Sequence, residues 1–212
     1  MNSSRMPVDE KQIVVTIADL EVRLLTPAAR EESGDRISFW WGVTSAAVAL
    51  AGHLTRLGEL RNDLVVDLGC GLGLAGITAG LLGASVTFTD YMPEALEFAR
   101  KNCVLNGMDI NRSRFLELDW ENPGDIGGFT MAIGSEIAYD YFTHSALIKL
   151  MELLTAPEGR IILAERKRLA VSRFVGRLRN RGFSSSETKY RIDNPDLPRQ
   201  EITLFTIERA DQ

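Results

Sequence analysis

Residues 65–73 read Val-Val-Asp-Leu-Gly-Cys-Gly-Leu-Gly, an apolar run followed by three alternating glycines. The run is typical of a buried strand, and the segment after the glycines is apolar and carries no charged residue before Asp90. Gly69, Gly71 and Gly73 have no side chain, so a ligand can lie directly against the backbone there. The stretch therefore predicts a strand, a ligand-binding turn and a helix.

Asp67, two residues before the first glycine, indicates which ligand the turn binds. In dinucleotide enzymes this position is usually apolar, and the N-terminus of the helix receives a pyrophosphate. A carboxylate here would repel a phosphate, but it suits a ligand with an ammonium or sulfonium group. Because S-adenosylmethionine carries both groups, we predict that it is the cofactor.

Strand-like and helix-like segments alternate after this turn. We expect strands over 64–68, 86–89, 114–118, 130–134 and 160–164, helices over 74–82, 93–106 and 142–154, and a further helix that ends at Arg181. Repeated strand–helix units predict an α/β fold with a doubly wound, mostly parallel, Rossmann-like sheet of seven strands. The last two extended segments, 187–192 and 201–208, have no helix between them and predict an antiparallel hairpin at the C-terminal edge.

The N-terminal part is predicted to be a small β extension. Residues 11–26 are rich in Val, Ile, Leu and Thr and predict two short strands with a turn near Ala18. The polar segment 27–36 is expected to be a loop, and a helix with Thr44 or Ser45 as its N-cap should run to about Gly58. We therefore divide the chain into an extension, residues 1–36, and a main domain, residues 37–212.

Composition and charge restrict the class of protein. The 212 residues are 45% hydrophobic, enough for one well-buried domain, and the net charge of −5 disfavours a general nucleic-acid binder. No apolar run approaches the roughly 18 residues that span a bilayer, and the first residues lack the apolar region of a signal peptide. Cys70 and Cys103 have no metal-ligand spacing and are expected to be reduced thiols of a cytoplasmic protein.

Basic residues are concentrated in one part of the chain. Residues 159–191 contain ten basic and two acidic side chains, a local charge of +8, so the rest of the chain carries −13. Arg173, Arg177 and Arg181 recur every four residues, which predicts that they share one face of a helix. This face is either a solvated surface or a docking strip for an acidic partner.

Side chains that suit an adenosyl ligand follow the next strands. In an open α/β sheet, ligands bind at the carboxyl ends of the strands near the point where the strand order reverses. Asp90 can accept hydrogen bonds from both ribose hydroxyls, Asp119 can accept one from an exocyclic amine, and Trp120 can cover a purine face. The predicted cofactor site also includes the neighbouring residues Cys70, Tyr91 and Ser135.

A dinucleotide enzyme is the alternative interpretation of the same turn. Residues 71–76, Gly-Leu-Gly-Leu-Ala-Gly, also satisfy the pattern G-x-G-x-x-G, and Asp90 would fit the ribose of NAD. The chain has no Tyr-x-x-x-Lys pair for hydride transfer, and the acid at Asp67 favours the adenosyl cofactor. An NAD-dependent oxidoreductase is therefore the least favoured function.

The segment 67–73, Asp90 and the sequence Leu118-Asp119-Trp120 resemble the cofactor motifs of class I, seven-strand methyltransferases. The resemblance covers most of the chain. It implies that the glycine turn approaches the methionine part of S-adenosylmethionine, that Asp90 holds the ribose and that Asp119 contacts the adenine.

Two further segments resemble the seven-strand protein-lysine methyltransferases. One is Phe39-Trp40-Trp41-Gly42 with the helix-like residues 49–54 after it, and the other is residues 134–140, Gly-Ser-Glu-Ile-Ala-Tyr-Asp. The resemblance implies methylation of a protein lysine, with Glu136 and Tyr139 as catalytic residues and both tryptophans beside the cofactor. Methylation of a small-molecule amine is one alternative, and a non-catalytic adenosyl-binding interaction module is the alternative from a different class.

Methylation of a lysine requires the neutral amine. Deprotonating a lysine at pH 7 costs about 4–5 kcal/mol. A carboxylate favours the ammonium, so Glu136 is expected to capture the lysine. A dry aromatic channel of Trp40, Trp41 and Tyr139 would favour the neutral amine.

The alternatives are that Glu136 caps the following helix and that the tryptophans pack against the sheet. His144 is expected at a helix surface.

Overall fold

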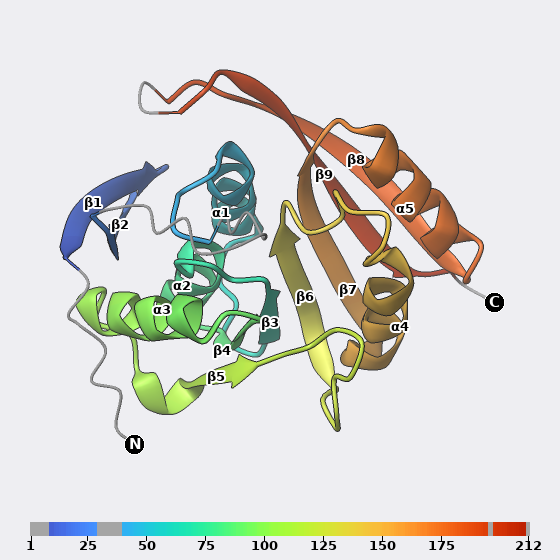
Figure 1. Ribbon diagram of the computed structural model, residues 1–212, viewed down its shortest axis with the longest axis horizontal. Helices are drawn as coiled ribbons and strands as arrows, with labels where there is room; N and C mark the ends of the chain where they lie inside the picture. The colour runs from blue at the N-terminus through green and yellow to red at the C-terminus, as the bar shows by residue number, and fades with distance from the viewer. Residues whose placement is uncertain (1–8, 29–39, 195–196, 211–212) are drawn as a thin grey trace.

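The computed structural model describes residues 9–28, 40–194 and 197–210, and a seven-stranded sheet lies at its centre (Figure 1). The strand order is β5-β4-β3-β6-β7-β9-β8. These strands are β3 (Leu64–Leu68), β4 (Ser85–Asp90), β5 (Ser113–Glu117), β6 (Phe129–Ser135), β7 (Thr155–Arg166), β8 (Phe183–Ile192) and β9 (Gln200–Arg209). The first five in spatial order are parallel, whereas β9 is antiparallel to both β7 and β8. The predicted mostly parallel sheet with an antiparallel edge hairpin is confirmed.

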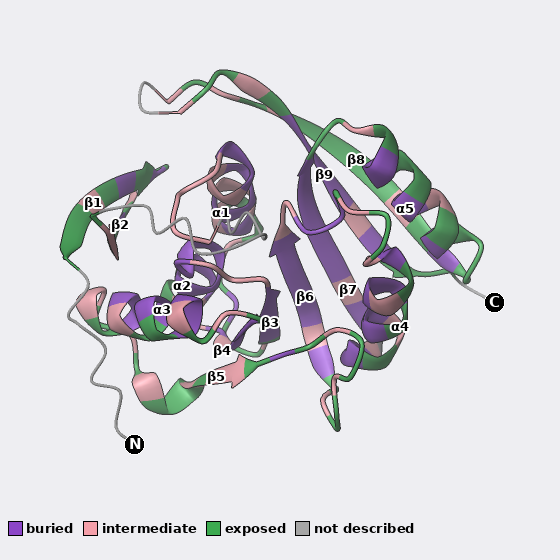
Figure 2. Cartoon of the chain, viewed as in Figure 1, coloured by how far each residue is buried: buried purple, intermediate pink, exposed green. Residues whose placement is uncertain are grey.

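Helices cover both faces of this sheet. One face carries α1 (Ser45–Leu57), α2 (Leu74–Leu81) and α3 (Pro93–Leu105), and the other carries α4 (His144–Leu154) and α5 (Leu169–Arg179). Adjacent residues of the central strands point to opposite faces, so Val65 joins the apolar core under the first group and Val66 the core under the second. The central strands are therefore buried, as Figure 2 shows. Of the helices in the described residues, none is long and apolar enough to cross a membrane.

The strand order reverses between β3 and β6. The chain leaves β3 through α2 toward β4, and it leaves β6 through α4 toward β7, on the other face. Such a reversal leaves an opening above the carboxyl ends of the two strands, where open α/β sheets bind ligands. The glycine turn after β3 lies at this place, as the sequence predicts.

The N-terminal segment forms the predicted hairpin of β1 (Glu10–Ile17) and β2 (Leu20–Pro27), which is a separate two-stranded sheet. Its inward side chains join the core formed with α1, α2 and α3. The buried Asn102 of α3 also binds it, because its side chain accepts from Leu25 N at 2.6 Å and donates to the carbonyls of Leu25 and Leu72. The hairpin thus packs as part of one folded unit, and the proposed boundary at residues 36 and 37 lies outside the described residues.

Two strands are longer than the sequence predicts. β7 begins at Thr155 instead of residue 160, because it pairs with β6 through a register shift in which Phe129 opposes Thr155 and Met131 opposes Arg160. A Cβ at Gly159 would lie 2.9 Å from the Phe129 carbonyl oxygen, so this bulge requires glycine. β8 begins at Phe183 instead of residue 187, and the Phe183 side chain is buried under α5.

Two glycines in helices allow a matched test of this packing. A Cβ at Gly76 of α2 would lie 2.4 Å from Phe88 Cε1 and 2.9 Å from Asp67 Oδ2, whereas a Cβ at Gly176 of α5 would have no neighbour within 4 Å. We expect Gly76→Ala to lower the free energy of unfolding by about 2–3 kcal/mol, and Gly176→Ala to raise it by about 0.5–1 kcal/mol. Urea unfolding of both variants tests this. Equal changes in the free energy of unfolding would contradict the close packing of Gly76 against Phe88 and Asp67.

Candidate active site

Acidic side chains follow or end several neighbouring strands at the carboxyl edge of the sheet. Asp67 lies on β3 and Asp90 ends β4, while Asp119 follows β5, Glu136 follows β6 and Glu165 lies near the end of β7. Because β3, β4, β5, β6 and β7 are parallel, these groups gather around the point where the strand order reverses. The structure therefore places the sequence-predicted acids at a common edge, together with one acid that the sequence analysis did not select.

The glycine turn is packed tightly by two other segments of the chain. Gly69, Gly71 and Gly73 have φ values of 62°, 51° and 87°, a region that favours glycine. A Cβ at Gly71 would lie 3.0 Å from the Trp40 carbonyl oxygen, and one at Gly69 would lie 3.2 Å from Ile137 Cγ2. The sequence suggests that these glycines make room for a ligand. The structure shows that they also make room for Trp40 and Ile137 of the protein itself.

The Asp67 side chain supports this turn through a hydrogen bond to the start of α2. Its side chain is buried, and Oδ2 accepts a hydrogen bond from Gly76 N in the first turn of α2 at 2.9 Å. Burial raises the pKa of this carboxyl to about 7, against the bond from Gly76, which lowers it. Burial also keeps Cys70 a thiol, because it raises that group's pKa well above its ordinary value. Contact of Asp67 with a cationic ligand stays a prediction.

Asp90 connects the glycine turn to the end of β4. Its Oδ2 accepts from Gly71 N at 3.0 Å, and its Oδ1 accepts from Met92 N at 2.9 Å. Each carboxylate oxygen has a second lone pair, so both can still accept from ribose hydroxyls. The carboxyl is nearly buried, which raises its pKa, and the neighbouring Tyr91 is exposed.

Asp119 and Trp120 follow β5, as predicted. Asp119 is exposed and accepts from Glu121 N at 2.9 Å and from the Asn122 side chain at 3.2 Å, and these bonds lower its pKa. A Cβ at Gly69 would lie 3.9 Å from Trp120 Cζ2, so the indole lies beside the glycine turn. The arrangement fits the proposed contacts with adenine, which remain predictions.

Glu136 lies in a strained turn directly after β6, with φ of 55°. Its side chain is 12% exposed and faces the end of β7, where Arg166 approaches it in a bidentate manner at 2.7–3.0 Å and Arg168 donates at 3.2 Å. The described bonds of this carboxylate all join it to these two arginines. The interpretation of Glu136 as a cap of α4 is therefore wrong, and the carboxylate is already paired before any lysine arrives.

Glu165 is the functional candidate that the sequence analysis missed. Its Oε1 accepts from Ile137 N and Ala138 N, both at 2.8 Å, and its Oε2 is buried without a partner among the described residues. Burial raises its pKa to about 7. The available signal was an acid near the end of an apolar strand, the pattern that also marks Asp67 and Asp90.

His144 binds the same segment, residues 137–138, through the Ala138 carbonyl. It was expected at a helix surface, but it is fully buried at the start of α4. Its Nε2 lies 2.9 Å from the Ala138 carbonyl oxygen, so this nitrogen must carry the proton, and its ring lies 5.0 Å from the Phe174 ring. Glu165 and His144 together fix residues 137–138 from two directions.

The three aromatic residues of the expected channel each have a different neighbour in the structure, and the channel itself stays a prediction. The Trp40 ring packs against Phe98 of α3, 5.6 Å between ring centroids, and the Trp41 carbonyl accepts from Thr26 Oγ1 at 2.6 Å. The Trp40 ring thus packs on α3, and its carbonyl lies beside the glycine turn. Tyr139 is half-exposed, with the Arg168 guanidinium 5.6 Å from its ring centre. Burial and the nearby Asp140 raise the pKa of Tyr139, so it stays a neutral phenol.

Comparison with known proteins identifies the family. Residues 30–181 match the sequence profile of the lysine methyltransferases. The chain belongs to this family. It is 38% identical to protein N-lysine methyltransferase METTL21A of Danio rerio over 70% of each chain, and 30% identical to EEF1A lysine methyltransferase 3 of Mus musculus over 70% of this chain and 71% of that protein. Magnesium protoporphyrin IX methyltransferase from Synechocystis, solved with bound S-adenosylmethionine, shares the fold with a TM-score of 0.61 at 19% identity, over 83% of this chain and 86% of that one.

As a lysine methyltransferase, the chain is an S-adenosylmethionine-dependent enzyme. The NAD-dependent oxidoreductase and the non-catalytic binding module are therefore wrong as interpretations. In this lysine methyltransferase the glycine turn, Asp90, and the Asp119–Trp120 pair form the candidate donor side. Residues 136–139, held by Glu165 and His144, form the candidate acceptor side.

The buried acids give this lysine methyltransferase a pH-dependent stability. Asp67 and Glu165 each have a pKa of about 7 in the fold, against 3.8 and 4.5 for ordinary carboxyls, so the folded state binds more protons than the unfolded chain between these values. Their contribution to the free energy of unfolding is present below about pH 4 and is lost as the pH rises through 7. We expect Asp67→Asn and Glu165→Gln each to make urea-unfolding stability less dependent on pH between 5 and 8. An unchanged pH dependence in the double variant would contradict this.

Proposed function

We propose that this lysine methyltransferase transfers the methyl group of S-adenosylmethionine to the side-chain amine of a lysine in a protein substrate. The observation that carries the proposal is the contact between the donor and acceptor sides. A Cβ at Gly69 would lie 3.2 Å from Ile137 Cγ2, so the glycine turn and the Glu136–Tyr139 segment pack directly on each other. A methyl group held by one and an amine held by the other would be adjacent, as in-line transfer requires.

On the donor side, the residues fit an adenosyl ligand. Asp90 presents two nearly buried oxygens that can accept from a ribose, and the exposed Asp119 keeps its charge to accept from the adenine amine. Bound S-adenosylmethionine supplies an electrophilic methyl group, so the protein needs only to bind and orient the reactants. The remaining residues proposed at this site are Trp40, Trp41, Asp67, Gly69, Cys70, Gly71, Gly73, Tyr91, Trp120 and Ser135.

On the acceptor side, the arginines change the role expected of Glu136. A lone carboxylate would favour the ammonium form of a lysine, whereas Glu136 with Arg166 and Arg168 forms a cluster with a net charge of +1. The arginines offset the charge of Glu136, and Arg168 also opposes Asp140 beside Tyr139. The ammonium is therefore favoured less than it would be by unpaired acids, and the roughly 4–5 kcal/mol cost of deprotonation at pH 7 is not increased as much. We propose that Glu136 positions the two arginines, and that the neutral Tyr139 hydroxyl accepts a hydrogen bond from the amine.

A labelling experiment tests this proposal. The protein is incubated with S-adenosylmethionine carrying a radioactive methyl group and a lysate of its source cells, and the protein and small-molecule fractions are counted separately. We expect label in a protein band, and at least about a tenfold loss of label with Glu136→Ala because the arginine cluster is released.

Two controls make the result specific. Binding of S-adenosylhomocysteine to Glu136→Ala, measured by calorimetry, should remain close to wild type. Glu201→Ala removes another ion-paired glutamate, the partner of Lys189 on the C-terminal hairpin, and should leave labelling unchanged. Label found only in the small-molecule fraction would contradict the proposal that the methyl acceptor is a protein.

We also propose that the protein works in the cytoplasm. Cys70 and Cys103 are both free thiols, and Cys103 is buried with a pKa raised to about 12 by burial. Unpaired cysteines are usual in a reducing compartment. Imaging of the tagged protein in its source cell tests this location.

A further inference from the structure

A groove between α4 and α5 lies outside the site described above. It has a volume of about 370 Å³. Both helices begin at the carboxyl edge of the sheet, so the groove runs away from the candidate acceptor side (Figure 1). Its lining residues are Ser145, Ile148, Lys149, Arg177, Asn180 and Arg181.

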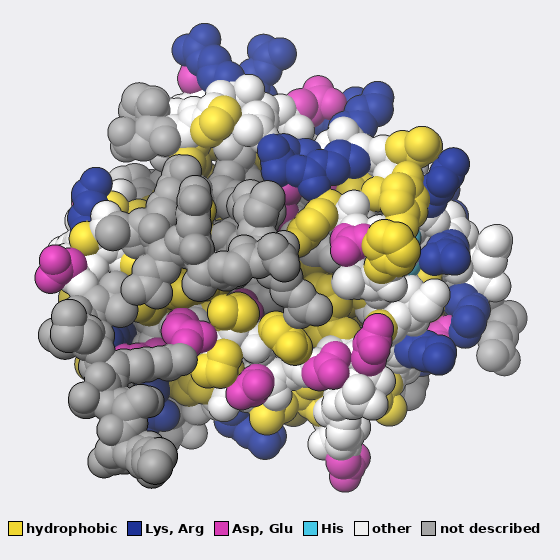
Figure 3. All heavy atoms as spheres, in the orientation of Figure 1, with side chains coloured by type: hydrophobic (Ala, Val, Ile, Leu, Met, Phe, Trp, Pro, Cys, Tyr) yellow, Lys and Arg dark blue, Asp and Glu magenta, His cyan; other side chains and the backbone are white. Residues whose placement is uncertain are grey.

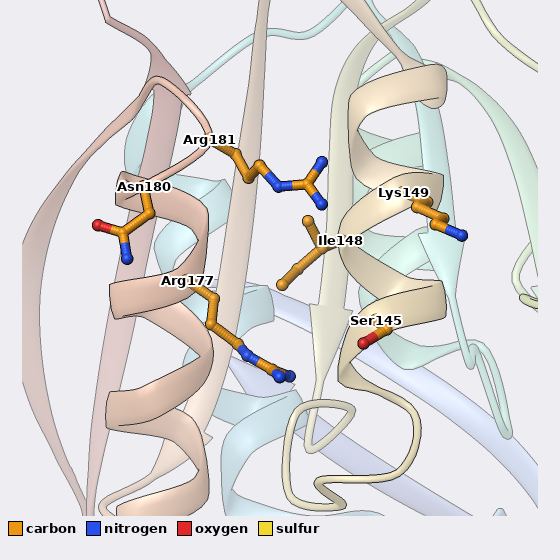
Figure 4. A pocket seen from close by; sticks show the side chains of 6 residues that line it. All are labelled: Ser145, Ile148, Lys149, Arg177, Asn180 and Arg181. Atoms are coloured by element: carbon orange, nitrogen blue, oxygen red, sulfur yellow. The ribbon is translucent and has the colours of Figure 1, made fainter.

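The groove is basic. Figure 4 shows the side chains of Arg177 and Arg181 reaching toward α4, whereas Lys149 points away from α5 on the outer rim. Arg181 shares its charge with Glu152 at 3.2 Å. Within the described part of the chain, Arg177 and Lys149 have no acid within 4 Å. Two cations are thus available to an incoming acidic group.

The structure also corrects the predicted arginine strip. α5 ends at Arg179, so Arg181 lies beyond it in the turn before β8 instead of on the helix face. Arg173 stands over the ring of Tyr141, 5.4 Å from its centre. The three arginines therefore do not form one solvated stripe, because Arg173 belongs to the end near the acceptor side and the other two line the groove.

Apolar side chains are exposed between the groove and the acceptor side. Phe142 is 93% exposed, Leu169 is 64% exposed, and Tyr141 is half-exposed. Figure 3 shows hydrophobic side chains beside Lys and Arg side chains over the region of α4 and α5. An aromatic residue held this far into solvent, three positions after Tyr139, is typical of a surface that binds another protein.

We propose that an acidic segment of the protein substrate docks in the α4–α5 groove while its lysine enters beside Tyr139. This proposal rests on the proposed function. Among the described residues, Arg177 offers an unpaired guanidinium to carboxylates, with Lys149 on the rim as a second cation. Phe142 and Tyr141 contact the substrate between the groove and Tyr139. Arg177 and Arg181 belong to the basic segment 159–191, whereas the rest of the chain carries −13, so an acidic protein is attracted to this part of the chain more than to the rest.

Peptide binding tests the groove without any methyl transfer. Two short fluorescent peptides each contain one lysine, flanked by glutamates in one and by glutamines in the other, and fluorescence anisotropy measures their binding to the full chain at low salt. We expect the glutamate peptide to bind more tightly, and Arg177→Glu to weaken it by about tenfold or more. Lys11→Glu, the same charge reversal on β1, should have little effect. Equal binding of both peptides, or equal binding by Arg177→Glu and Lys11→Glu, would overturn the proposal.

The labelling assay separates this proposal from the proposed function. Arg177→Glu should lower the initial rate of protein labelling at low salt, and Lys11→Glu should not. If the wild type labels no protein, the proposed methylation of a protein lysine is wrong, whatever the result of the peptide-binding measurement. If protein is labelled equally by both variants, the groove is wrong and the acceptor stands.

Discussion

Replacing Asp90 with alanine is expected to weaken binding of S-adenosylhomocysteine by about 100-fold or more. The substitution leaves the partly buried amides of Gly71 and Met92 without their carboxylate partner, at about 1–3 kcal/mol each. It also removes the acceptor proposed for the ribose, and both losses act on the turn that would hold the ligand. Isothermal titration calorimetry measures the change.

The control for this variant is Asp63→Ala. Asp63 lies at the amino edge of the sheet before β3, where its carboxylate accepts from Thr130 Oγ1 at 2.9 Å. It is an acid of the same type with a structural bond, far from the carboxyl edge, and we expect its loss to leave ligand binding unchanged. Similar affinities for Asp90→Ala and Asp63→Ala would contradict the proposed donor site.

Glu165→Ala is expected to reduce methyl transfer by about 100-fold while ligand binding changes only a few-fold. Without the carboxylate, the amides of Ile137 and Ala138 lose their acceptor, and the segment that carries Glu136 and Tyr139 is no longer fixed. The free energy of unfolding should fall by about 2–4 kcal/mol because two buried amides are left unpaired. Radioactive methyl transfer at a temperature where the variant is folded measures the first effect, and urea unfolding measures the second.

Glu165→Gln distinguishes positioning from a need for the charge. Its amide oxygen can still accept from both backbone amides, so we expect most of the methyl transfer to remain. Equal losses for the glutamine and alanine variants would show that Glu165 does more than hold this segment. Wild-type transfer by Glu165→Ala would show that residues 137–138 need no such support.

The parts of the site that could be predicted depend on local sequence. The turn at Gly69–Gly73 follows from backbone conformation, since all three glycines have positive φ. Asp90 was identifiable because it ends an apolar strand. The C-terminal hairpin followed from two extended segments with no helix between them. Each of these signals lies within a few residues of chain.

The parts that could not be predicted depend on distant residues. The pairing of Glu136 with Arg166 spans 30 residues, and nothing in either segment specifies it. The burial of His144 depends on Phe174, and the close approach of Trp40 to Gly71 depends on how the N-terminal segment packs. Sequence pattern indicated that β8 and β9 pair, but the insertion of β9 beside β7 is a property of the assembled sheet.

The measurement that tests the central claim most directly is the identity of the methylated atom. The protein band labelled by the wild type is digested, and tandem mass spectrometry locates the added methyl group. The expected result is methylation of a lysine side-chain amine, lost with Asp90→Ala and strongly reduced with Glu136→Ala. Methylation of a different residue type, or a lysine mark that persists in both variants, would contradict the account.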